Sequence, residues 1–389
     1  MKKVLVFDSH PVQYRVPLWR ELASKNINLK VAYATDCSIK GYNDKQFGVK
    51  VSWDGDMLQG YKYTVLNNEN GEPLRGWSSL TGRGIKSLIK QENPDYIFLT
   101  GFNYKYDMVA YLNAIRYGIP LLLRCETQDF VKNRSKIKFL FRHLVYSIIY
   151  KGISKIFFIG ELNKEHYLRH GVNEKKLSPA KYTTLNRFKD LTTSQKRVIR
   201  DKKRNEYGID NSKYVIGFSG KLIPKKNPDL LLEAVTYLSE SIKQNINFLF
   251  VGSGELEQNL KNKSKELNET FNITSIYTGF VNQSEILENY LVMDLLVLPS
   301  RKQGETWGLV ANEGLQAGCS VIVSDSVGSH KDFESLERFD VCKTEDARDL
   351  ALKIENLFHF KYNPEWAKET VLEYSIETNA TNIENVINK

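Results

Sequence analysis

The feature that most limits the possible folds of this chain is a repeated pattern of short apolar runs separated by longer amphipathic stretches. The runs are rich in Val, Ile, Leu and Phe, and most of them end at Gly, Ser, Asp or Pro. They occupy 4–7, 29–33, 96–100, 120–124 and 156–159 in a first set, and 214–218, 247–251, 275–277, 294–298 and 320–323 in a second set. Continuous rather than alternating apolar runs indicate strands that are covered on both faces, as in parallel sheets.

The stretches between the runs carry helical spacing, as in 228–240 and 284–290, so a strand–helix pattern is written twice. We therefore expect an α/β protein with two doubly wound parallel-sheet domains. A chain of 389 residues is long for a single core, which agrees with two domains. The segment 181–210 is rich in Lys and Arg and lacks a long apolar run, so we place the domain boundary at residue 188.

Two facing domains of this kind leave a cleft where the carboxyl ends of their strands meet, and ligands bind there. The segment from Ser300 to Gly318 follows a second-set strand as a polar loop, and we expect a helix to begin near Trp307. The positive end of such a helix suits an anion. Glu305 and Glu313 would lie ~12 Å apart on a continuous helix, too far for a glycosidase pair. The two glutamates fit opposite ends of an elongated ligand, or else a solvated amphipathic helix.

A second candidate segment, 217–228, follows the first strand of the second set and contains Gly220, Lys221 and Lys226. Lysines at a strand's carboxyl end can neutralise a diphosphate directly, without a metal ion. The alternative is an ordinary basic loop. Gly252 and Gly254 follow the next strand of the second set. A lone Gly-x-Gly pattern is a weak signal, and it becomes informative here because it falls at the same edge of the predicted sheet as the lysine segment.

In the first set, the loop 9–17 follows the first strand and places His10 and Gln13 on the cleft side. His10 could act as a base or hydrogen-bond donor, or it could be a structural hydrogen-bonding residue. Glu126 follows the strand at 120–124 and would also face the cleft, unless it is a surface carboxylate paired with a neighbouring Arg.

Residues 131–155 contain seven Lys or Arg and no Asp or Glu. Apolar residues recur there at helical spacing: Ile137, Phe141, Leu144, Val145 and Ile148. We interpret this stripe as the core face of a helix covering the sheet, and we leave open whether the basic face contacts an anionic membrane.

A formal net charge of +9 fits nucleic acid, an anionic membrane or a phosphorylated small substrate. Nucleic acid is disfavoured because helix-turn-helix, zinc and RNA-binding signatures are missing from the sequence. The sequence also offers no carboxylate cluster at metal spacing. The N-terminal apolar run is too short for a signal peptide, and no run approaches ~20 apolar residues, so we expect a cytoplasmic protein.

Taken together, these segments resemble the family-4 retaining glycosyltransferases of the GT-B fold, over nearly the whole chain and most closely from 214 to 332. The family's Glu–seven residues–Glu motif corresponds to Glu305 and Glu313. Its glycine–basic–lysine loop corresponds to Gly220, Lys221 and Lys226. The opening segment 10–19 is similar to a subgroup found among bacterial surface-polysaccharide and O-antigen enzymes.

The resemblance implies a role for each matching position. Glu313 would bind the ribose hydroxyls and Glu305 the hydroxyls of the donor sugar, while Lys221 and Lys226 would stabilise the leaving diphosphate. The remaining donor-binding positions would be Gly220, Gly254, Phe280, Val281, Gly308, Leu309 and Val310. His10, Gln13 and Glu126 would lie on the acceptor side. Lys221 stands where the family usually has Arg, and Cys125-Glu126-Thr127 stands where many members have a His.

The resemblance also implies an N-terminal acceptor domain (1–188), a C-terminal donor domain (189–366) and a terminal helix (367–389) that crosses back to the first domain. The implied function is retaining transfer from a nucleotide-sugar, with UDP expected first and GDP next. The resemblance implies that neither a divalent metal ion nor a cofactor is needed. The implied acceptor is a glycan or lipid-linked glycan in polysaccharide or lipopolysaccharide biosynthesis, on the inner face of the cell membrane. A sugar-nucleotide epimerase and a catalytically silent GT-B scaffold remain the alternatives.

Overall fold

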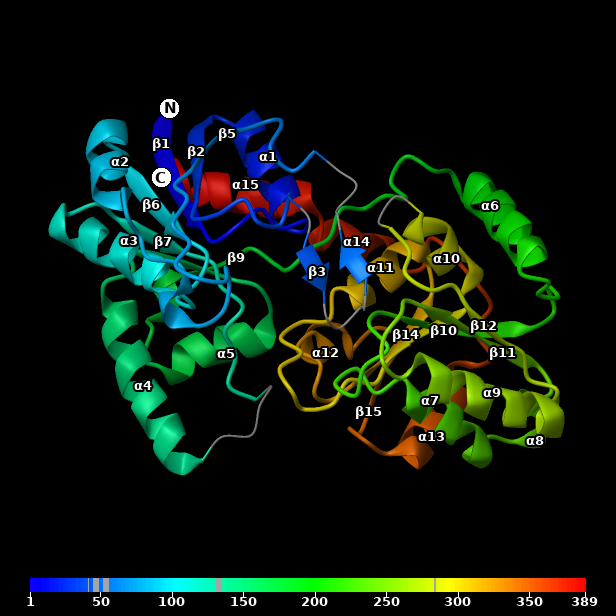
Figure 1. The fold of residues 1–389 in the computed structure, drawn as a ribbon. Coiled ribbons are helices and arrows are strands. Elements are labelled where there is room, and N and C mark those ends of the chain that lie inside the picture. Colours follow the sequence, from blue (N-terminus) through cyan, green and yellow to red (C-terminus); the bar gives the residue numbers. More distant parts are fainter. Residues whose placement is uncertain (41, 45–48, 52–55, 131–134, 283–284) are drawn as a thin grey trace.

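The structure, a computed structural model, describes residues 1–389 except 41, 45–48, 52–55, 131–134 and 283–284. Two parallel sheets form the centres of two α/β domains, with helices on both faces of each sheet (Figure 1). The first sheet has seven strands in the order β5-β2-β1-β6-β7-β8-β9, and the second has six in the order β12-β11-β10-β13-β14-β15. These two sheets confirm the predicted doubly wound α/β architecture.

The first domain is built from residues up to about 180. Its sheet contains β1 (Lys2–Asp8), β2 (Ile27–Tyr33), β5 (Lys62–Val65), β6 (Tyr96–Leu99), β7 (Leu121–Leu123), β8 (Lys155–Phe158) and β9 (Leu177–Pro179). Its helices are α1 (Val16–Ser24), α2 (Ile85–Glu92), α3 (Lys105–Arg116), α4 (Lys136–Lys151) and α5 (Glu161–Arg169), with short 3-10 turns η1 (Trp77–Ser79) and η2 (Glu174–Lys176). A two-stranded hairpin, β3 (Tyr42–Asp44) and β4 (Val49–Val51), stands apart from the sheet.

The second domain repeats this arrangement. Its sheet contains β10 (Tyr214–Ser219), β11 (Ile246–Val251), β12 (Ser275–Tyr277), β13 (Leu295–Leu298), β14 (Ser320–Ser324) and β15 (Phe339–Cys342). Its helices are α6 (Thr193–Glu206), α7 (Asp229–Ala234), η3 (Val235–Tyr237), α8 (Glu240–Lys243), α9 (Glu257–Phe271), α10 (Ile286–Val292), α11 (Val310–Ala317), α12 (His330–Phe333) and α13 (Ala347–Leu357). The helix predicted from residue 284 lies partly outside the described residues, and α10 begins at Ile286.

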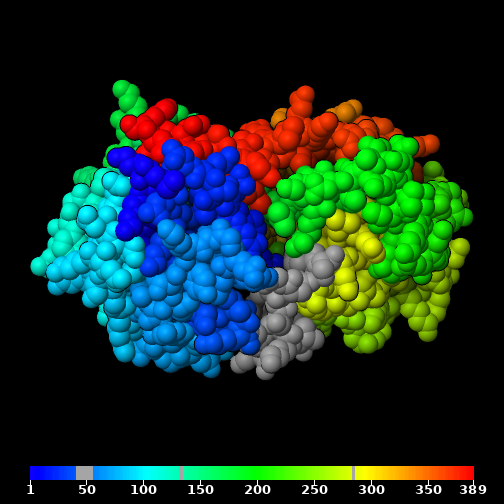
Figure 2. Space-filling model, turned by 90° about the horizontal axis from the view of Figure 1, so that it is seen from above, coloured from blue at the N-terminus to red at the C-terminus, as the bar shows by residue number. Residues whose placement is uncertain are grey.

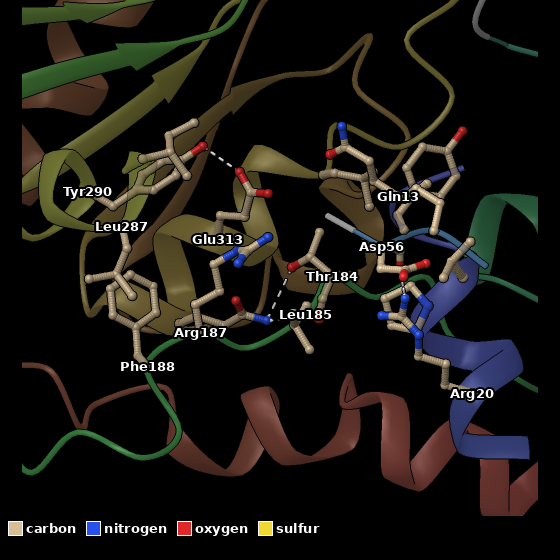
Figure 3. Close-up of a pocket in the computed structure, with 17 residues that line it drawn as sticks. Gln13, Arg20, Asp56, Thr184, Leu185, Arg187, Phe188, Leu287, Tyr290 and Glu313 are labelled. Atoms are coloured by element: carbon tan, nitrogen blue, oxygen red, sulfur yellow. Dashed lines mark hydrogen bonds between the residues drawn. The ribbon is translucent and has the colours of Figure 1, made fainter. Parts of the chain in front are cut away.

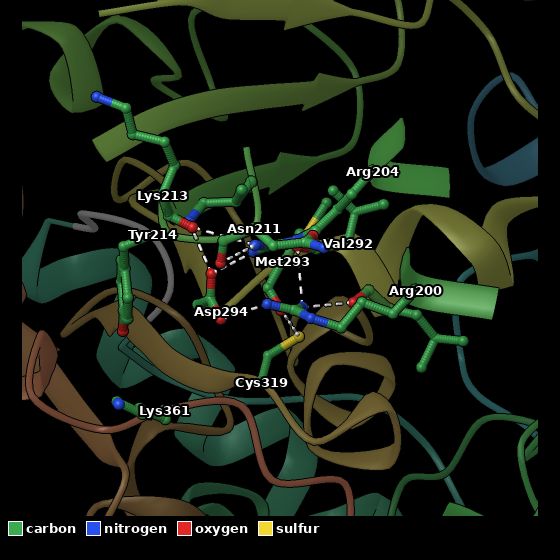
Figure 4. A network of polar contacts seen from close by, with 12 residues as sticks. Arg200, Arg204, Asn211, Lys213, Tyr214, Val292, Met293, Asp294, Cys319 and Lys361 are labelled. Atoms are coloured by element: carbon green, nitrogen blue, oxygen red, sulfur yellow. Dashed lines mark hydrogen bonds and ion pairs between the residues drawn. The ribbon is translucent and has the colours of Figure 1, made fainter. Parts of the chain in front are cut away.

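Helix α6, in the basic segment between the two sets of strands, is tied to the second domain by a buried ion network (Figure 4). Arg200 and Arg204 place guanidinium nitrogens 2.5 and 2.6 Å from the two carboxylate oxygens of Asp294. Both arginines also donate to the carbonyl of Val292. Two of the positive charges in this segment are therefore structural, and they fix α6 against α10.

The end of the chain crosses from the second domain to the first (Figures 1 and 2). Helix α14 (Lys368–Glu373) contacts α11, and α15 (Ile376–Ile387) packs against α1 and β9. Ala380, Ile383 and Ile387 are buried in the same core as Trp19.

A polar network also joins the two domains beside the cleft. Lys181 Nζ lies 2.9 Å from Glu161 Oε1 and 3.2 Å from Asp332 Oδ1. The Tyr374 hydroxyl donates to the same Asp332 carboxylate at 2.8 Å, and the backbone N–H of Glu161 donates to its other oxygen at 3.0 Å. Because Asp332 comes from α12 and Lys181 follows β9, this buried ion pair joins the two domains.

Helix α4 corrects one sequence prediction. Its apolar stripe was expected to cover the sheet, but Ile137, Phe141, Leu144 and Ile148 are exposed, and Val145 is only partly buried. Lys132 and Arg134 of the predicted basic segment lie outside the described residues. Within the described ranges, none of the helices is both long and apolar enough to cross a membrane.

Candidate functional site

The loops that follow β10 and β13 meet at the carboxyl edge of the second sheet. Lys226 Nζ lies 2.6 Å from Glu305 Oε2. In the same loops, Lys225 Nζ donates to the carbonyl of Gly304 at 3.2 Å, and the N–H of Arg301 donates to the carbonyl of Lys225 at 2.9 Å. The structure thus brings together two of the predicted catalytic residues, and Lys221 lies in the same β10 loop.

The glycines after β10 and β11 allow their loops to pack backbone against backbone. Gly252 has a φ of +133°, and a Cβ at this position would lie 2.0 Å from the carbonyl oxygen of Gly220. A Cβ on Gly254 would lie 2.5 Å from the carbonyl oxygen of Leu222. The Gly-Ser-Gly sequence is therefore explained by packing, because its glycines let this loop contact the backbone of the lysine loop directly. Direct donor contacts from Gly220 and Gly254 stay a prediction.

The helix after the Glu305 loop begins later than predicted, at Val310 instead of near Trp307. Gly308 has a φ of +86°, which a right-handed helix cannot include, and its missing Cβ leaves room for Val327 and Leu298. Trp307 is buried and donates from Nε1 to Asn312 Oδ1 at 2.7 Å, which anchors the loop to the helix.

Glu313 lies in the first turn of α11 and faces a cleft between the domains (Figure 3). Its carboxylate accepts a hydrogen bond from the hydroxyl of Tyr290, which also lies 2.9 Å from Ser219 Oγ. Burial raises the pKa of Glu313 to about 7, although the Tyr290 hydrogen bond and the charge of Arg187 act in the opposite direction. The group is therefore poised to titrate near neutral pH.

This first cleft, about 930 Å³ and open to solvent, is lined by both domains. The first domain contributes Gln13, Tyr14, Pro17, Arg20 and Asp56, and the second contributes Ile286, Leu287, Tyr290, Leu309 and Glu313. Of the predicted donor-side residues, Leu309 and Glu313 line it, while Val281 and Val310 pack against the core beneath. Phe280 follows β12 farther along the sheet edge.

A second cleft, of about 1140 Å³, lies at the carboxyl ends of β1, β6 and β7. His10 and Glu126 both line it, together with Gly304 and Thr306 from the Glu305 loop. The predicted acceptor-side residues are thus close to the second-domain loop. Gln13 lines the first cleft instead, and its Nε2 is buried without a hydrogen bond in the described part of the chain.

His10 is a neutral imidazole in this setting. Burial, together with the charge of Arg15, lowers the pKa of His10 to about 3, and its Nδ1 lies 3.0 Å from Ser9 Oγ. A neutral ring can still form one hydrogen bond, so a hydrogen bond to a substrate and a structural role are both compatible with this geometry. A pKa of about 3 makes the ring a poor general base near neutral pH.

Several cleft residues were missed by the sequence interpretation. Arg15 lines the second cleft and forms a 2.7 Å ion pair with the buried Asp8 at the end of β1. Arg142 and Tyr146, from the inner face of α4, line the same cleft. Arg187 lines the first cleft near Glu313. Arg15 falls within the loop that follows the first strand and could have been found from that position, whereas nothing in the sequence singles out Arg187.

Asp129, His166 and His170 place potential metal-binding atoms within 4.8 Å of one another. Those atoms already have protein partners. His166 Nδ1 lies 3.0 Å from Asp129 Oδ1, and His170 Nδ1 lies 2.8 Å from the carbonyl of His166. Arg169 donates to the other Asp129 oxygen at 2.8 Å and supplies the compensating positive charge. We interpret the group as a network that ties α5 to the loop before α4.

Part of the chain is similar to a known family. Residues 199–369 match the family model "Glycosyl transferases group 1". The matched region includes the lysine loop and Glu305, which meet at the edge of the second sheet, and it also includes Glu313.

Two curated relatives are D-inositol 3-phosphate glycosyltransferases. The one from Segniliparus rotundus is 30% identical over 31% of this chain and 27% of the relative. The one from Mycolicibacterium vanbaalenii is 25% identical over 56% of this chain and 49% of the relative. The chain thus spans about half or less of the length of these relatives.

Two solved structures match the whole chain. A glycosyltransferase from Rickettsia africae superimposes with a TM-score of 0.71, at 17% identity over 99% of this chain and 97% of its own. Anabaena HepE, in complex with UDP and glucose, superimposes with a TM-score of 0.67, at 14% identity over 100% of both chains. These likenesses confirm the GT-B fold.

Proposed function

We propose that this protein is a glycosyltransferase that moves a sugar from a nucleotide-sugar to a hydroxyl group of a glycan or lipid-linked glycan. The observation that carries the proposal is the contact between the lysine loop and the Glu305 loop, inside the region that matches the glycosyl transferases group 1 model. We propose UDP as the nucleotide, with GDP as the next candidate.

The reaction follows from the charges at the sheet edge. Lys221 and Lys226 neutralise the donor diphosphate, Glu305 binds the sugar hydroxyls, and Glu313 binds the ribose at the start of α11. The bond between the anomeric carbon and the phosphate oxygen breaks, and the acceptor oxygen bonds to the same face of that carbon. Because attack and departure occur on the same face, the configuration is retained, and the departing phosphate oxygen takes the acceptor's proton. The two lysines compensate the charge of the leaving diphosphate, so no divalent metal is required.

The acceptor belongs in the second cleft under this proposal. His10 and Glu126 line that cleft on the first domain, and Gly304 and Thr306 close it from the second. An acceptor hydroxyl bound there lies next to the loop that carries Glu305. We propose surface-polysaccharide assembly as the biological setting, from the resemblance of the opening segment. The curated relatives act on a different acceptor by name, so inositol phosphate belongs in the acceptor panel.

Thermal unfolding of the purified protein with UDP-, GDP-, ADP- and dTDP-sugars tests the proposal. A donor at about a hundred times its Kd should raise Tm by roughly 3 °C. Added acceptor should then release the nucleotide and form a glycoside. Conversion of the sugar without any acceptor would indicate an epimerase. The absence of a shift with all four donors would instead indicate a silent scaffold, and either outcome overturns the proposal.

A further inference from the structure

The outer face of α4 is a continuous apolar surface, which we call the α4 apolar face and define by Ile137, Leu140, Phe141, Leu144 and Ile148. Ile137 is 82% exposed, Leu140 70%, Phe141 67%, and Leu144 and Ile148 59% each. Their spacing of three and four residues places all five on one side of the helix. So many exposed apolar side chains on one face indicate a surface that another body covers.

The carboxyl-terminal part of the helix anchors it to the first domain, whereas residues 135–141 are all exposed. Ile149 and Tyr150 on the opposite side are buried in the core of the first domain. Tyr150 Oη lies 2.8 Å from His166 Nε2 of α5, and Tyr111 of α3 donates to the carbonyl of Ile149 at 3.1 Å. In Figure 1, α4 lies along the outer edge of the first domain, away from the second.

The charges around the α4 apolar face are positive, and they indicate a negatively charged partner. Lys136 and Lys138 are exposed and lie about 100° to either side of Ile137 around the helix axis, and Lys151 is exposed in the last turn. Residues 131–155 contain no acidic residue. Two copies of this chain meeting through α4 would therefore oppose positive charge with positive charge. A surface with fixed negative charge and an apolar interior is complementary to it.

We propose that the α4 apolar face docks the protein on a bilayer that contains anionic phospholipids. The apolar side chains enter the boundary between headgroups and acyl chains, and the flanking lysines bind lipid phosphates. Docking on a bilayer requires neither the sugar donor nor the acceptor, so it can be tested independently of the proposed transfer reaction.

Flotation of the full chain with vesicles tests the docking, using phosphatidylcholine alone and a phosphatidylglycerol–phosphatidylcholine mixture. We expect binding to the mixed vesicles that weakens as salt is raised. The double variant Phe141→Ser/Leu144→Ser should bind roughly tenfold or more weakly. Lys136→Ala and Lys138→Ala should each weaken binding by roughly fivefold at low salt.

The matched control is Val198→Ser/Leu352→Ser, which removes two comparably exposed apolar side chains from the second domain and should bind like the parent. Circular dichroism and Tm should be unchanged in all variants, because every substituted side chain is exposed. Equal binding by the parent and the Phe141→Ser/Leu144→Ser variant would overturn the proposal. Failure of the parent to bind the mixed vesicles would also overturn the proposal. One such case would be a parent that does not bind vesicles but sediments as a dimer, which the Phe141→Ser/Leu144→Ser variant dissociates.

Discussion

Lys226 Nζ lies 2.6 Å from Glu305 Oε2, and this ion pair joins the loops after two neighbouring strands, β10 and β13. We expect Lys226→Ala to lower kcat/KM about 100-fold or more, because the leaving diphosphate loses a compensating charge. Glu305→Gln should also lower kcat/KM, and the double variant should fall by less than the product of the two effects. Steady-state kinetics with the best donor measures all three variants.

The matched control for that experiment is Lys261→Ala, which breaks a 2.7 Å pair with Glu257 on α9, away from both clefts. Its kinetics should equal those of the parent. Parent-like transfer by Lys226→Ala, in a protein that remains folded, would show that the lysine loop has no part in the reaction.

The pKa of Glu313, raised to about 7 by burial, predicts pH-dependent donor binding. A carboxylate accepts ribose hydroxyls better than a carboxylic acid does, so affinity for a UDP-sugar should increase as pH rises from about 6 to 8. A UDP-sugar is preferable to UDP, whose terminal phosphate also titrates. For Glu313→Gln, calorimetry should give a larger Kd for the UDP-sugar than that of the parent, and this Kd should be nearly independent of pH. An unchanged pH profile in this variant would assign the titration to another group.

The same shift predicts the direction of a stability change. Because the folded-state pKa of Glu313 is above its unfolded value, the contribution to stability is complete below the unfolded pKa of about 4.5. It is lost as pH rises through about 7. In urea unfolding, the free energy of unfolding of the parent should therefore fall relative to that of Glu313→Gln as pH rises from about 4.5 to about 7. Above pH 7 the difference between the two proteins should stay constant.

Gly252→Ala should damage both stability and transfer, since its Cβ would lie 2.0 Å from the Gly220 carbonyl behind the lysine loop. We expect a loss of about 2–4 kcal/mol in unfolding free energy, together with a higher KM for the donor. Gly118→Ala is the control, because Gly118 also has a positive φ but no atom within 4 Å of the added Cβ. It should cost only about 1 kcal/mol and leave KM unchanged. Similar losses in both variants would mean that backbone strain, and not the contact between loops, determines the effect.

Lys181→Ala should destabilise the arrangement of the two domains, because Asp332 would be left buried without its cationic partner. We expect a loss of about 3 kcal/mol. Lys331→Ala breaks another contact between the domains, with Glu165 at 2.7 Å, but both partners are well exposed and the loss should be below about 1 kcal/mol. Differential scanning calorimetry of both variants makes the comparison. Equal losses would show that the buried network does not hold the domains.

The sequence predicted the strands that are continuous apolar runs, and all of the runs in both sets form strands in the structure. It did not reveal β5 and β9, which lie at the edges of the first sheet, or β15, which lies at an edge of the second sheet. These strands include polar residues such as Lys62, Ser178 and Asp340. Edge strands bury less surface, so the apolar pattern is weaker there. The start of α11 at Val310, and not near Trp307, results from the positive φ of Gly308, which could not be predicted from the residue pattern.

The candidate site was predictable where it depends on loops at strand ends, as the contact between Lys226 and Glu305 illustrates. It was not predictable where side chains arrive from distant elements. Arg187 reaches the first cleft from the connection between the domains, and Tyr146 reaches the second from the inner face of α4. Helical spacing in α4 showed that one face is apolar, but only the packing of α3 and α5 determines which face is covered.

Helix α4 presents one face to solvent and lines the second cleft with Arg142 and Tyr146 on the other. A single helix thickness, about 10 Å, therefore separates that cleft from the proposed bilayer contact. An acceptor anchored in the same leaflet would search for the cleft in two dimensions. Its effective concentration would far exceed that of an untethered molecule. Transfer to a lipid-linked acceptor could then proceed rapidly even if the cleft itself held the sugar only weakly.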